Sequence, residues 1–329
     1  HEQNPMIGFL FSLETISCQS SGGKHVDWFY QVKSSRGFAG FYLDTTSRSA
    51  FKSVPDLNNI NNPVSVTLTD LYQSNKYFVT MFNDDTPTGK GGSQFAHQKG
   101  VIAYDLESKT GIYLQHSTPK WPPMLSSGYS YTNDDYGQHF FCVNIDQAQL
   151  EVIGHALYVS RPLVYENTFD MNWLSQKAPS LHRAISGSYE KTPTATKQSL
   201  KSRAGQVFDM FYKNKQASID IWGELIAPQK KANMLVETWL RDKKAQPFCD
   251  GYKVQMVGTV RFLGSQWNEG SDHSKWGVSE QGSFICTSDI NFMKSQEERG
   301  GTAVCLDDSS VGGAFKNAIV SLDPDLTCQ

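Results

Sequence analysis

Several features that often identify a protein class are missing from this sequence. Its apolar stretches, such as residues 7–11, fall well short of the roughly 18 residues that a membrane-spanning helix needs, so no membrane span is expected. No CxxC pair occurs, which excludes the spacing of a zinc knuckle. No N-x-S/T sequon occurs either, so N-glycosylation gives no support for secretion.

The chain also lacks a strong charge of one sign. Its formal net charge is −3, which argues against a simple basic coat for nucleic acid. The eight histidines titrate near pH 6.5, and their full protonation would change this sum to −3 + 8 = +5. The protein could therefore attract a polyanion at mildly acidic pH. A hydrophobic content of 39% over 329 residues predicts a globular chain with one large domain or two core-sized units.

Six cysteines are scattered along the chain, at Cys18, Cys142, Cys249, Cys286, Cys305 and Cys328. An even count without metal-ligand spacing favours three disulfides in an oxidising compartment, with six reduced, buried thiols as the alternative. The chain begins at His1 rather than Met, so we expect a processed form whose signal peptide lies outside it. Residues 1–17 are expected to be an N-terminal extension.

Strand and helix patterns alternate along the chain. Residues 26–33 and 40–44 have the aromatic and β-branched content of strands, and residues 100–116 have the pattern of a hairpin. Apolar positions three to four apart predict helices at residues 206–214 and 232–241. These patterns predict a mixed α/β protein in which helices cover a large sheet, without a flexible linker.

Two H-x-K motifs occur about half a chain length apart, His97–Lys99 in HQKGV and His273–Lys275 in HSKWGV. Residues i and i+2 of a strand point to the same face, so each motif would present an imidazole beside an ammonium. Two facing motifs would suit phosphodiester hydrolysis without a metal. One histidine would attack phosphorus, the other would protonate the leaving oxygen, and the lysines would hold the phosphoryl oxygens. A single H-x-K is more often a solvated turn.

Seven segments carry a resemblance to a known family: VDWFYQVK (26–33), GFYLD (40–44), HQKGVIAYD (97–105), YLQHSTPKWPP (113–123), CVNI (142–145), DHSKWGVS (272–279) and DINFMKSQEERGG (289–301). They resemble the deoxyribonuclease II family, a branch of the phospholipase D-like superfamily, from about Cys18 to Cys328. HSxPxxPP and DHSKW are the most specific of these signatures.

The resemblance implies a secreted or lysosomal endonuclease that cuts double-stranded DNA at acidic pH without a metal or other cofactor, leaving 3′-phosphate ends. It implies a phospholipase D-like α/β fold with two pseudo-symmetric halves, each a sheet flanked by helices, and an active site between them. Residues 18–329 would then form one domain, with halves at about 18–165 and 166–329.

The resemblance also implies individual roles. His97 with Lys99 and His273 with Lys275 would be catalytic, with His97 as nucleophile and His273 as general acid, although the two roles are exchangeable on this basis. His116 would support the site. Three supporting residues are also implied around these catalytic groups: Asp105, Asp272 and Asn291. Of these, Asp272 would orient His273. The implied disulfides are Cys18–Cys142, Cys249–Cys328 and Cys286–Cys305.

The main departure from the family pattern is Gly277, which stands where many animal relatives have cysteine. No departure removes a catalytic group, but divergent secreted copies, as in parasitic nematodes, can lose activity while they keep the fold. An inactive homologue that acts as a binding or host-interaction protein is therefore the alternative hypothesis. Phospholipase-type hydrolysis is a weaker one, and a homodimer that completes the DNA surface stays open.

Overall fold

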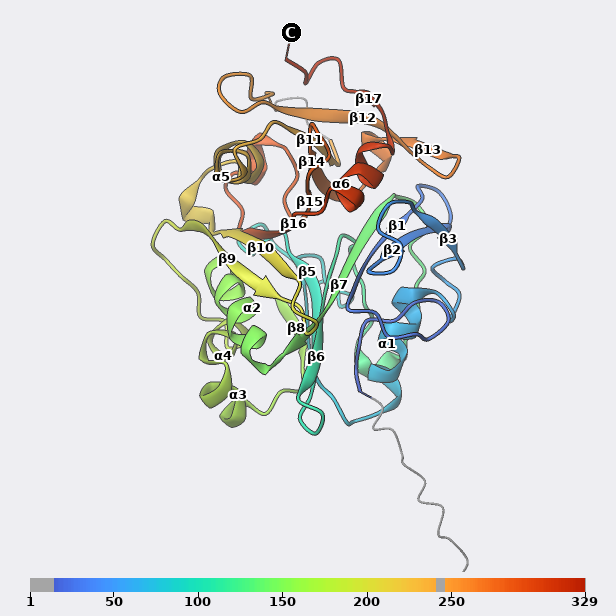
Figure 1. Ribbon diagram of the computed structural model, residues 1–329. Helices are drawn as coiled ribbons and strands as arrows, with labels where there is room; N and C mark the ends of the chain where they lie inside the picture. Colours follow the sequence, from blue (N-terminus) through green and yellow to red (C-terminus); the bar gives the residue numbers. More distant parts are fainter. Residues whose placement is uncertain (1–14, 241–245, 329) are drawn as a thin grey trace, which may run out of the picture.

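Two antiparallel-rich β-sheets form the framework of the protein (Figure 1). The computed structural model describes residues 15–240 and 246–328. The first sheet has the strand order β3-β2-β1-β7-β6-β5-β4-β8. Its strands are β1 Trp28–Lys33, β2 Gly40–Asp44, β3 Lys52–Val54, β4 Phe78–Asn83, β5 Lys99–Asp105, β6 Thr110–His116, β7 Gln138–Asp146 and β8 Val164–Asn167.

The second sheet has the order β13-β12-β11-β14-β15-β16-β10-β9, and β17 pairs with β12. Its strands are β9 Ala195–Lys201, β10 Val207–Lys213, β11 Met234–Thr238, β12 Val254–Phe262, β13 Ser265–Asn268, β14 Lys275–Ser279, β15 Ile285–Ser288, β16 Gly301–Leu306 and β17 Ile319–Leu322. The α-helices are α1 Pro63–Gln73, α2 Gln147–Ser160, α3 Met171–Lys177, α4 Pro179–Ile185, α5 Ala227–Lys230 and α6 Ser309–Lys316, and a π-helix, η3, covers Ile221–Ile226.

The two sheets contain the same five-strand pattern. The antiparallel series β1-β7-β6-β5-β4 in the first sheet has the counterpart β10-β16-β15-β14-β11 in the second. In this correspondence β5 matches β14, and each of these strands begins at the lysine of an H-x-K motif. The predicted boundary between residues 165 and 166 lies inside β8, which still pairs with β4 of the first sheet.

The helices and sheets are stacked in layers around three apolar clusters. Helix α1 packs on one face of the first sheet, and η3 packs on the far face of the second. Helices α2 and α6 belong to the central cluster, which joins the facing sides of both sheets, and α2 contacts β7, β9 and β10. Helix α1 begins where it does because Pro63 occupies its first turn and the Asn62 side chain accepts a hydrogen bond from the Val64 amide.

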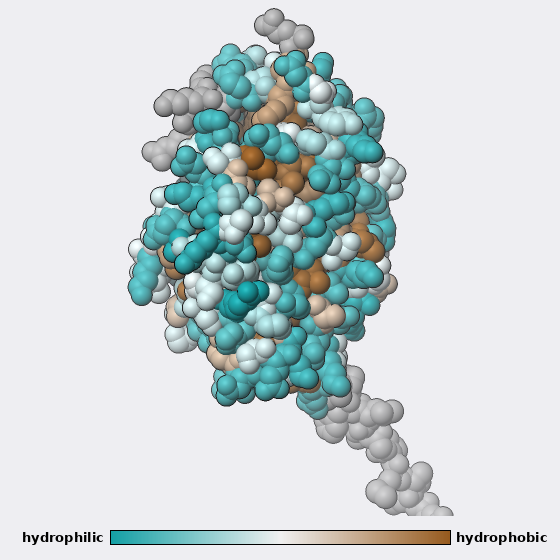
Figure 2. All heavy atoms as spheres, turned by 90° about the vertical axis from the view of Figure 1, so that its left-hand side faces the viewer, coloured by the Kyte–Doolittle hydropathy of each residue, from teal (hydrophilic) through white to brown (hydrophobic). Residues whose placement is uncertain are grey.

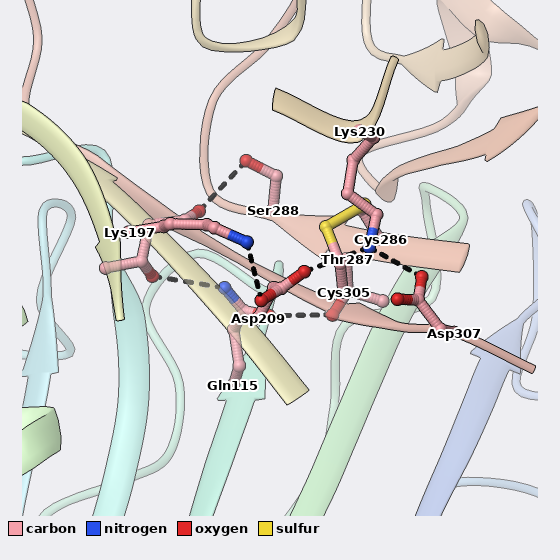
Figure 3. The surroundings of a disulfide bond; sticks show 10 residues. Gln115, Lys197, Asp209, Lys230, Cys286, Thr287, Ser288, Cys305 and Asp307 are labelled. Atoms are coloured by element: carbon pink, nitrogen blue, oxygen red, sulfur yellow. Dashed lines mark hydrogen bonds and ion pairs between the residues drawn. A yellow bond between two sulfur atoms is a disulfide. The ribbon is translucent and has the colours of Figure 1, made fainter. Parts of the chain in front are cut away.

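Three disulfides reinforce this arrangement, and they join the pairs that the family resemblance implies: Cys18–Cys142, Cys249–Cys328 and Cys286–Cys305. Figure 3 shows the last of them between β15 and β16. Beside it, Thr287 of the second sheet donates a 2.9 Å hydrogen bond to Gln115 of the first. The contact between the sheets therefore includes a polar link at Gln115 and Thr287 as well as the central apolar cluster.

Two expectations about secondary structure were wrong. Residues 206–214 and 232–241, predicted as helices, contain strands β10 and β11. β11 lies between β12 and β14 with all five residues buried, and β10 lies between β9 and β16. A short apolar run that is buried on both faces has no diagnostic period, so the sequence could not distinguish strand from helix here. The patterns alone predicted one large sheet, whereas the structure has two sheets, as the family resemblance implies.

The remaining expectations concern the first residues and the surface. Most of the proposed 1–17 extension lies outside the described residues, and Ile16 and Ser17 at its end are buried. Within residues 15–240 and 246–328, no helix is long and apolar enough to cross a membrane. Hydrophilic side chains cover most of the face in Figure 2, where hydrophobic ones form small groups.

Candidate active site

The two H-x-K motifs come together where the sheets meet. Lys99 and Lys275 begin β5 and β14, and they are only 4% and 3% exposed. Gly137, just before β7, forms a parallel bridge with Asp272, so the first sheet directly contacts the segment that carries the second motif. The amide of His273 donates a 2.8 Å bond to Gly137 of the first half, and the amide of His97 donates a 2.9 Å bond to Gly300 of the second. Burial chiefly lowers the pKa of both histidines, and Lys99 and Lys275 each lower both pKa values further. The structure therefore places all four side chains in one site.

The imidazole of His97 is held by the backbone of the second half. Its Nδ1 lies 2.8 Å from the carbonyl oxygen of Asp289, and its amide donates a 2.9 Å bond to the carbonyl of Gly300. A carbonyl only accepts, so Nδ1 carries the proton and Nε2 is left with a free lone pair. Burial and the charge on Lys99 lower the pKa of His97 well below 6.5, against the opposing effect of Asp84. His97 is thus a neutral imidazole whose Nε2 keeps the lone pair that a nucleophile needs.

Asp84 organises the cations around His97, and sequence reasoning did not identify it. Its carboxylate pairs with Lys99, accepts a 3.0 Å bond from Arg299 and lies 3.7 Å from His97 Nε2. Burial alone would raise its pKa, but Lys99, His97 and Arg299 hold the pKa well below its ordinary value. The register could have revealed it, since Asp84 directly follows β4, whose last residue Asn83 pairs with Lys99.

His273 lies between two aromatic side chains. Its ring stacks on Tyr136 with centroids 3.9 Å apart and planes 8° apart, and the Trp239 ring lies at 65° to it with its centroid 4.7 Å away. Burial, Lys275, Lys99 and Lys33 lower the pKa of His273 to about 3. An anion bound between the lysines would offset their charges and raise this pKa. The stacked rings would also favour an imidazolium by a cation–π interaction.

Lys275 is poised between its charged and neutral forms. Burial and repulsion from Lys99 lower its pKa to about 7, and its ammonium donates a 2.6 Å bond to the carbonyl of His273. Two ammonium groups that repel each other disfavour each other's charge until an anion binds between them. The pair is therefore suited to hold the equatorial oxygens of a phosphoryl group.

Two further histidines, His116 and His139, are buried near the lysines. His116, at the end of β6, is 1% exposed and packs its ring against Trp121 at 4.8 Å, and neither ring nitrogen has a hydrogen-bond partner among the described residues. His139, in β7, is also buried, and its Nδ1 accepts a 3.0 Å bond from the Lys275 amide. Burial and the charge on Lys99 lower both pKa values well below 6.5. His139 was missed because it stands alone, without a motif around it.

The three supporting residues have different locations. Asp105 is at the opposite end of β5 from Lys99, about 20 Å away at the rise of a strand, where it pairs with Lys76. It is not at the site. Asp272 is fully buried, but its carboxylate accepts bonds from Trp267 (2.6 Å) and the Ser274 amide (2.7 Å) rather than from the His273 ring.

Asn291 lies beside the second motif. The amide of the next residue, Phe292, donates a 3.0 Å bond to Thr238, which is in register with Lys275. The buried Oδ1 of Asn291 has no partner within the described part of the chain. Gly277 lies two residues beyond Lys275 in β14, where a Cβ atom would come within 2.8 Å of the Trp222 ring. A larger side chain at this departure from the family pattern would therefore require the Trp222 ring to shift.

The arrangement offers acid–base and nucleophilic chemistry beside two cations. In the described ranges, no group of three or more His, Cys, Asp or Glu side chains is arranged to hold a metal ion. The buried groups that could bind an anion are Lys99 and Lys275, and the groups that could exchange protons are the imidazoles of His97 and His273. Together they match the requirements of phosphoryl transfer through a covalent intermediate.

Comparisons with known proteins cover nearly the whole chain. The family model "Deoxyribonuclease II" matches residues 17–325. The chain is 31% identical to "Cell-death-related nuclease 7" of Caenorhabditis elegans, over 94% of this chain and 88% of that protein. It is 30% identical to "Deoxyribonuclease-2-alpha" of Rattus norvegicus, over 94% and 95% of the two chains. It is also 30% identical to "Plancitoxin-1" of Acanthaster planci, over 94% and 93%.

Proposed function

The chain belongs to the deoxyribonuclease II family, and on this premise we propose that it is an acid endodeoxyribonuclease that works without a divalent metal. It is a hydrolase of the deoxyribonuclease II type with a phospholipase D-like α/β fold. The observation that carries the proposal is the meeting of the two H-x-K motifs from separate sheets, each with a buried lysine. Double-stranded DNA is the proposed substrate.

The proposed first step uses the free nitrogen of His97. Nε2 attacks phosphorus while the bond from phosphorus to the 5′ oxygen breaks, and that oxygen takes a proton from His273. The product on the enzyme is a phosphohistidine that carries the 3′ end of the DNA. In the second step, water gives a proton to His273 and attacks phosphorus, and the P–N bond breaks. The released strands have 3′-phosphate and 5′-hydroxyl ends.

The hydrogen bond from His97 Nδ1 to Asp289 supports this choice of nucleophile, because it leaves the lone pair on Nε2, the ring nitrogen on the side of Asp84. His139 supports the second motif by accepting a hydrogen bond from the Lys275 amide, and His116 would support the site as a buried imidazole. The acidic optimum would follow from His273. The pKa of His273 is about 3 in the free protein, and a bound phosphodiester would raise it toward the mildly acidic range by neutralising the lysines.

Plasmid cleavage at pH 5 in the presence of EDTA tests the proposal directly. Wild-type protein should nick and linearise the plasmid, and His97→Ala or His273→Ala should each lower the rate by about 10³-fold or more. His25→Ala is the matched control, because His25 is exposed and distant in sequence from both motifs. If folded wild-type protein does not cut while a family enzyme cuts under the same conditions, the inactive binding homologue replaces this proposal.

The cellular setting is part of the same proposal. Three disulfides and the lack of a membrane-spanning helix within the described residues fit a protein of the oxidising secretory pathway, either secreted or lysosomal. A homodimer would lengthen the surface available to duplex DNA. Sedimentation of the purified protein at pH 5 would distinguish the monomer from the dimer.

A further inference from the structure

Two buried lysines occupy matching places in the two sheets. Lys33 is the last residue of β1 and is in register with Gln138, the first residue of β7. Lys213 is the last residue of β10 and is in register with Gly301, the first residue of β16. β1 and β10, like β7 and β16, are counterparts in the shared five-strand pattern. Both lysines are 0% exposed, and neither belongs to an H-x-K motif.

Each ammonium binds backbone carbonyls of the loops next to it. Lys33 Nζ donates to the carbonyls of Ser34 (2.7 Å), Gly37 (2.7 Å) and Asp134 (3.3 Å). Lys213 Nζ donates to the carbonyls of Gln296 (3.3 Å), Glu297 (2.7 Å) and Arg299 (2.6 Å). Three acceptors satisfy the three N–H donors of an ammonium, which burial would otherwise make very unfavourable. Each lysine therefore fixes the backbone of the loops around its ammonium group.

Each of these loops then holds a catalytic histidine of the other half. The loop before β7 ends at Gly137, whose carbonyl accepts a 2.8 Å bond from the amide of His273. The loop before β16 ends at Gly300, whose carbonyl accepts a 2.9 Å bond from the amide of His97. The connection is thus crossed, since Lys33 supports the loop that holds His273 and Lys213 supports the loop that holds His97.

The sequence of the two loops repeats as well. Residues 134–137 are DDYG and residues 297–300 are EERG, and in each case a disulfide cysteine follows the glycine by the same spacing. Neither glycine has room for a side chain, because a Cβ atom would lie 2.5 Å from Asp272 on Gly137 and 2.0 Å from the Ser160 carbonyl on Gly300. Both loops therefore approach their neighbours as closely as a backbone can.

We propose that Lys33 and Lys213 are a pair of positioning residues that fix His273 and His97, respectively, across the boundary between the two sheets. The inference rests on the proposed function, because it concerns how that site is aligned. A nucleophile and an acid on opposite sides of phosphorus must be in line, and a displacement of about 1 Å at a reacting group can cost about 100-fold in rate. Anchoring each histidine to the opposite half couples the two positions to each other.

The test replaces each lysine by methionine, whose side chain has a similar length but no ammonium group. Lys33→Met should accelerate hydrogen exchange of the His273 amide by about tenfold and leave the His97 amide unchanged, and Lys213→Met should do the reverse. Both variants should lower kcat about 10- to 100-fold with a smaller effect on KM. Lys230→Met is the control, since its mostly buried ammonium forms ion pairs with Asp209 and Asp307 and should affect neither amide.

The exchange measurement does not need catalysis, so it separates this inference from the proposed function. Crossed changes in exchange without any DNA cleavage by the wild type would support the positioning role and refute the nuclease. Uniform changes at both amides, or none, in folded variants would overturn the positioning role whatever the activity. If a methionine variant does not fold, Lys33→Gln or Lys213→Gln takes its place, because glutamine retains a neutral hydrogen-bond donor. The same crossed changes in hydrogen exchange of the His273 and His97 amides are expected.

Discussion

The Nδ1 atom of His139 accepts a 3.0 Å hydrogen bond from the backbone amide of Lys275. His139 belongs to β7 of the first sheet, and Lys275 is the first residue of β14 in the second. Because Nδ1 accepts, the ring carries its proton on Nε2 and is neutral. Burial and the charges on Lys275 and Lys99 favour the same form, since they lower the pKa of His139 well below 6.5. One side chain of the first sheet thus fixes the end of the second motif, where β14 begins.

This bond predicts different outcomes for two substitutions of His139. His139→Leu removes the acceptor and leaves the buried Lys275 amide without it, so the free energy of unfolding should fall by about 1–3 kcal/mol and kcat by about tenfold. His139→Asn keeps an oxygen near the position of Nδ1 and should retain most of the stability and most of kcat. Urea denaturation and plasmid cleavage at pH 5 measure the two effects. Equal losses in both variants would show that ring volume, rather than the hydrogen bond, is what matters.

A second prediction concerns Asp84. Asp84→Asn leaves Lys99 and Arg299 without their anion, and removal of one partner from such a buried cluster should cost about 3 kcal/mol near neutral pH. The native pKa of Asp84 is depressed, so its stabilisation exists above its unfolded pKa of about 3.9 and is lost as pH falls through the native value. Thermal unfolding at pH 7, 5 and 2 should show a large difference that shrinks toward pH 2.

The neighbouring carboxylate provides the control for Asp84. Asp85 directly follows Asp84 but makes no ion pair in the described structure, so Asp85→Asn should unfold like the wild type. The Asp84→Asn protein should also have a lower pKa at His97, because Asp84 is the group that opposes its cationic neighbours. A histidine titration by NMR that showed an unchanged or higher pKa would contradict this account of the cluster.

A third prediction concerns a buried acid next to the second motif. Glu237, in β11, is 0% exposed, and neither carboxylate oxygen has a hydrogen-bond partner in residues 15–240 and 246–328. Burial, Asp272 and Glu269 raise its pKa well above 4.5. A raised native pKa gives stability that is fully present below the unfolded value of about 4.3 and is lost as pH rises through the native value. Glu237→Gln should therefore raise the melting temperature at pH 7.5 and change little at pH 4.

The four site histidines change the pH dependence of wild-type stability in the opposite direction. Their lowered native pKa values reduce stability as pH falls below about 6.5. The difference between Glu237→Gln and wild type removes this shared contribution. Glu107→Gln, at an exposed carboxylate, should leave the melting temperature unchanged at both pH values. A glutamine variant at position 237 that is less stable than wild type at pH 7.5 would mean that the native carboxylate is charged and paired.

The sequence identified the two H-x-K motifs of the candidate site but not the residues around them. Two H-x-K motifs are recognisable because each keeps its groups within three residues, and the structure brings them together. Asp84 and His139 reach the site through strand register and sheet contact, which no local pattern reveals. Asp105 shows the converse, since it is near His97 in sequence but at the other end of β5. β11 was misassigned because burial on both faces removes the period on which such predictions depend.

A fourth prediction concerns the stacked pair of Tyr136 and His273. An aromatic face beside an imidazolium contributes about 0.5–2 kcal/mol, which corresponds to roughly one pH unit in the pKa of the general acid. Tyr136→Leu should therefore lower the pKa of His273 in the substrate complex and move the alkaline limb of the kcat profile to lower pH by up to about one unit. Tyr136→Phe keeps the ring and should keep the wild-type profile. The measurement is cleavage of a short duplex from pH 4 to 7.5 at saturating substrate, and identical profiles for the leucine and phenylalanine variants would rule out a role for the stacked ring in protonating His273.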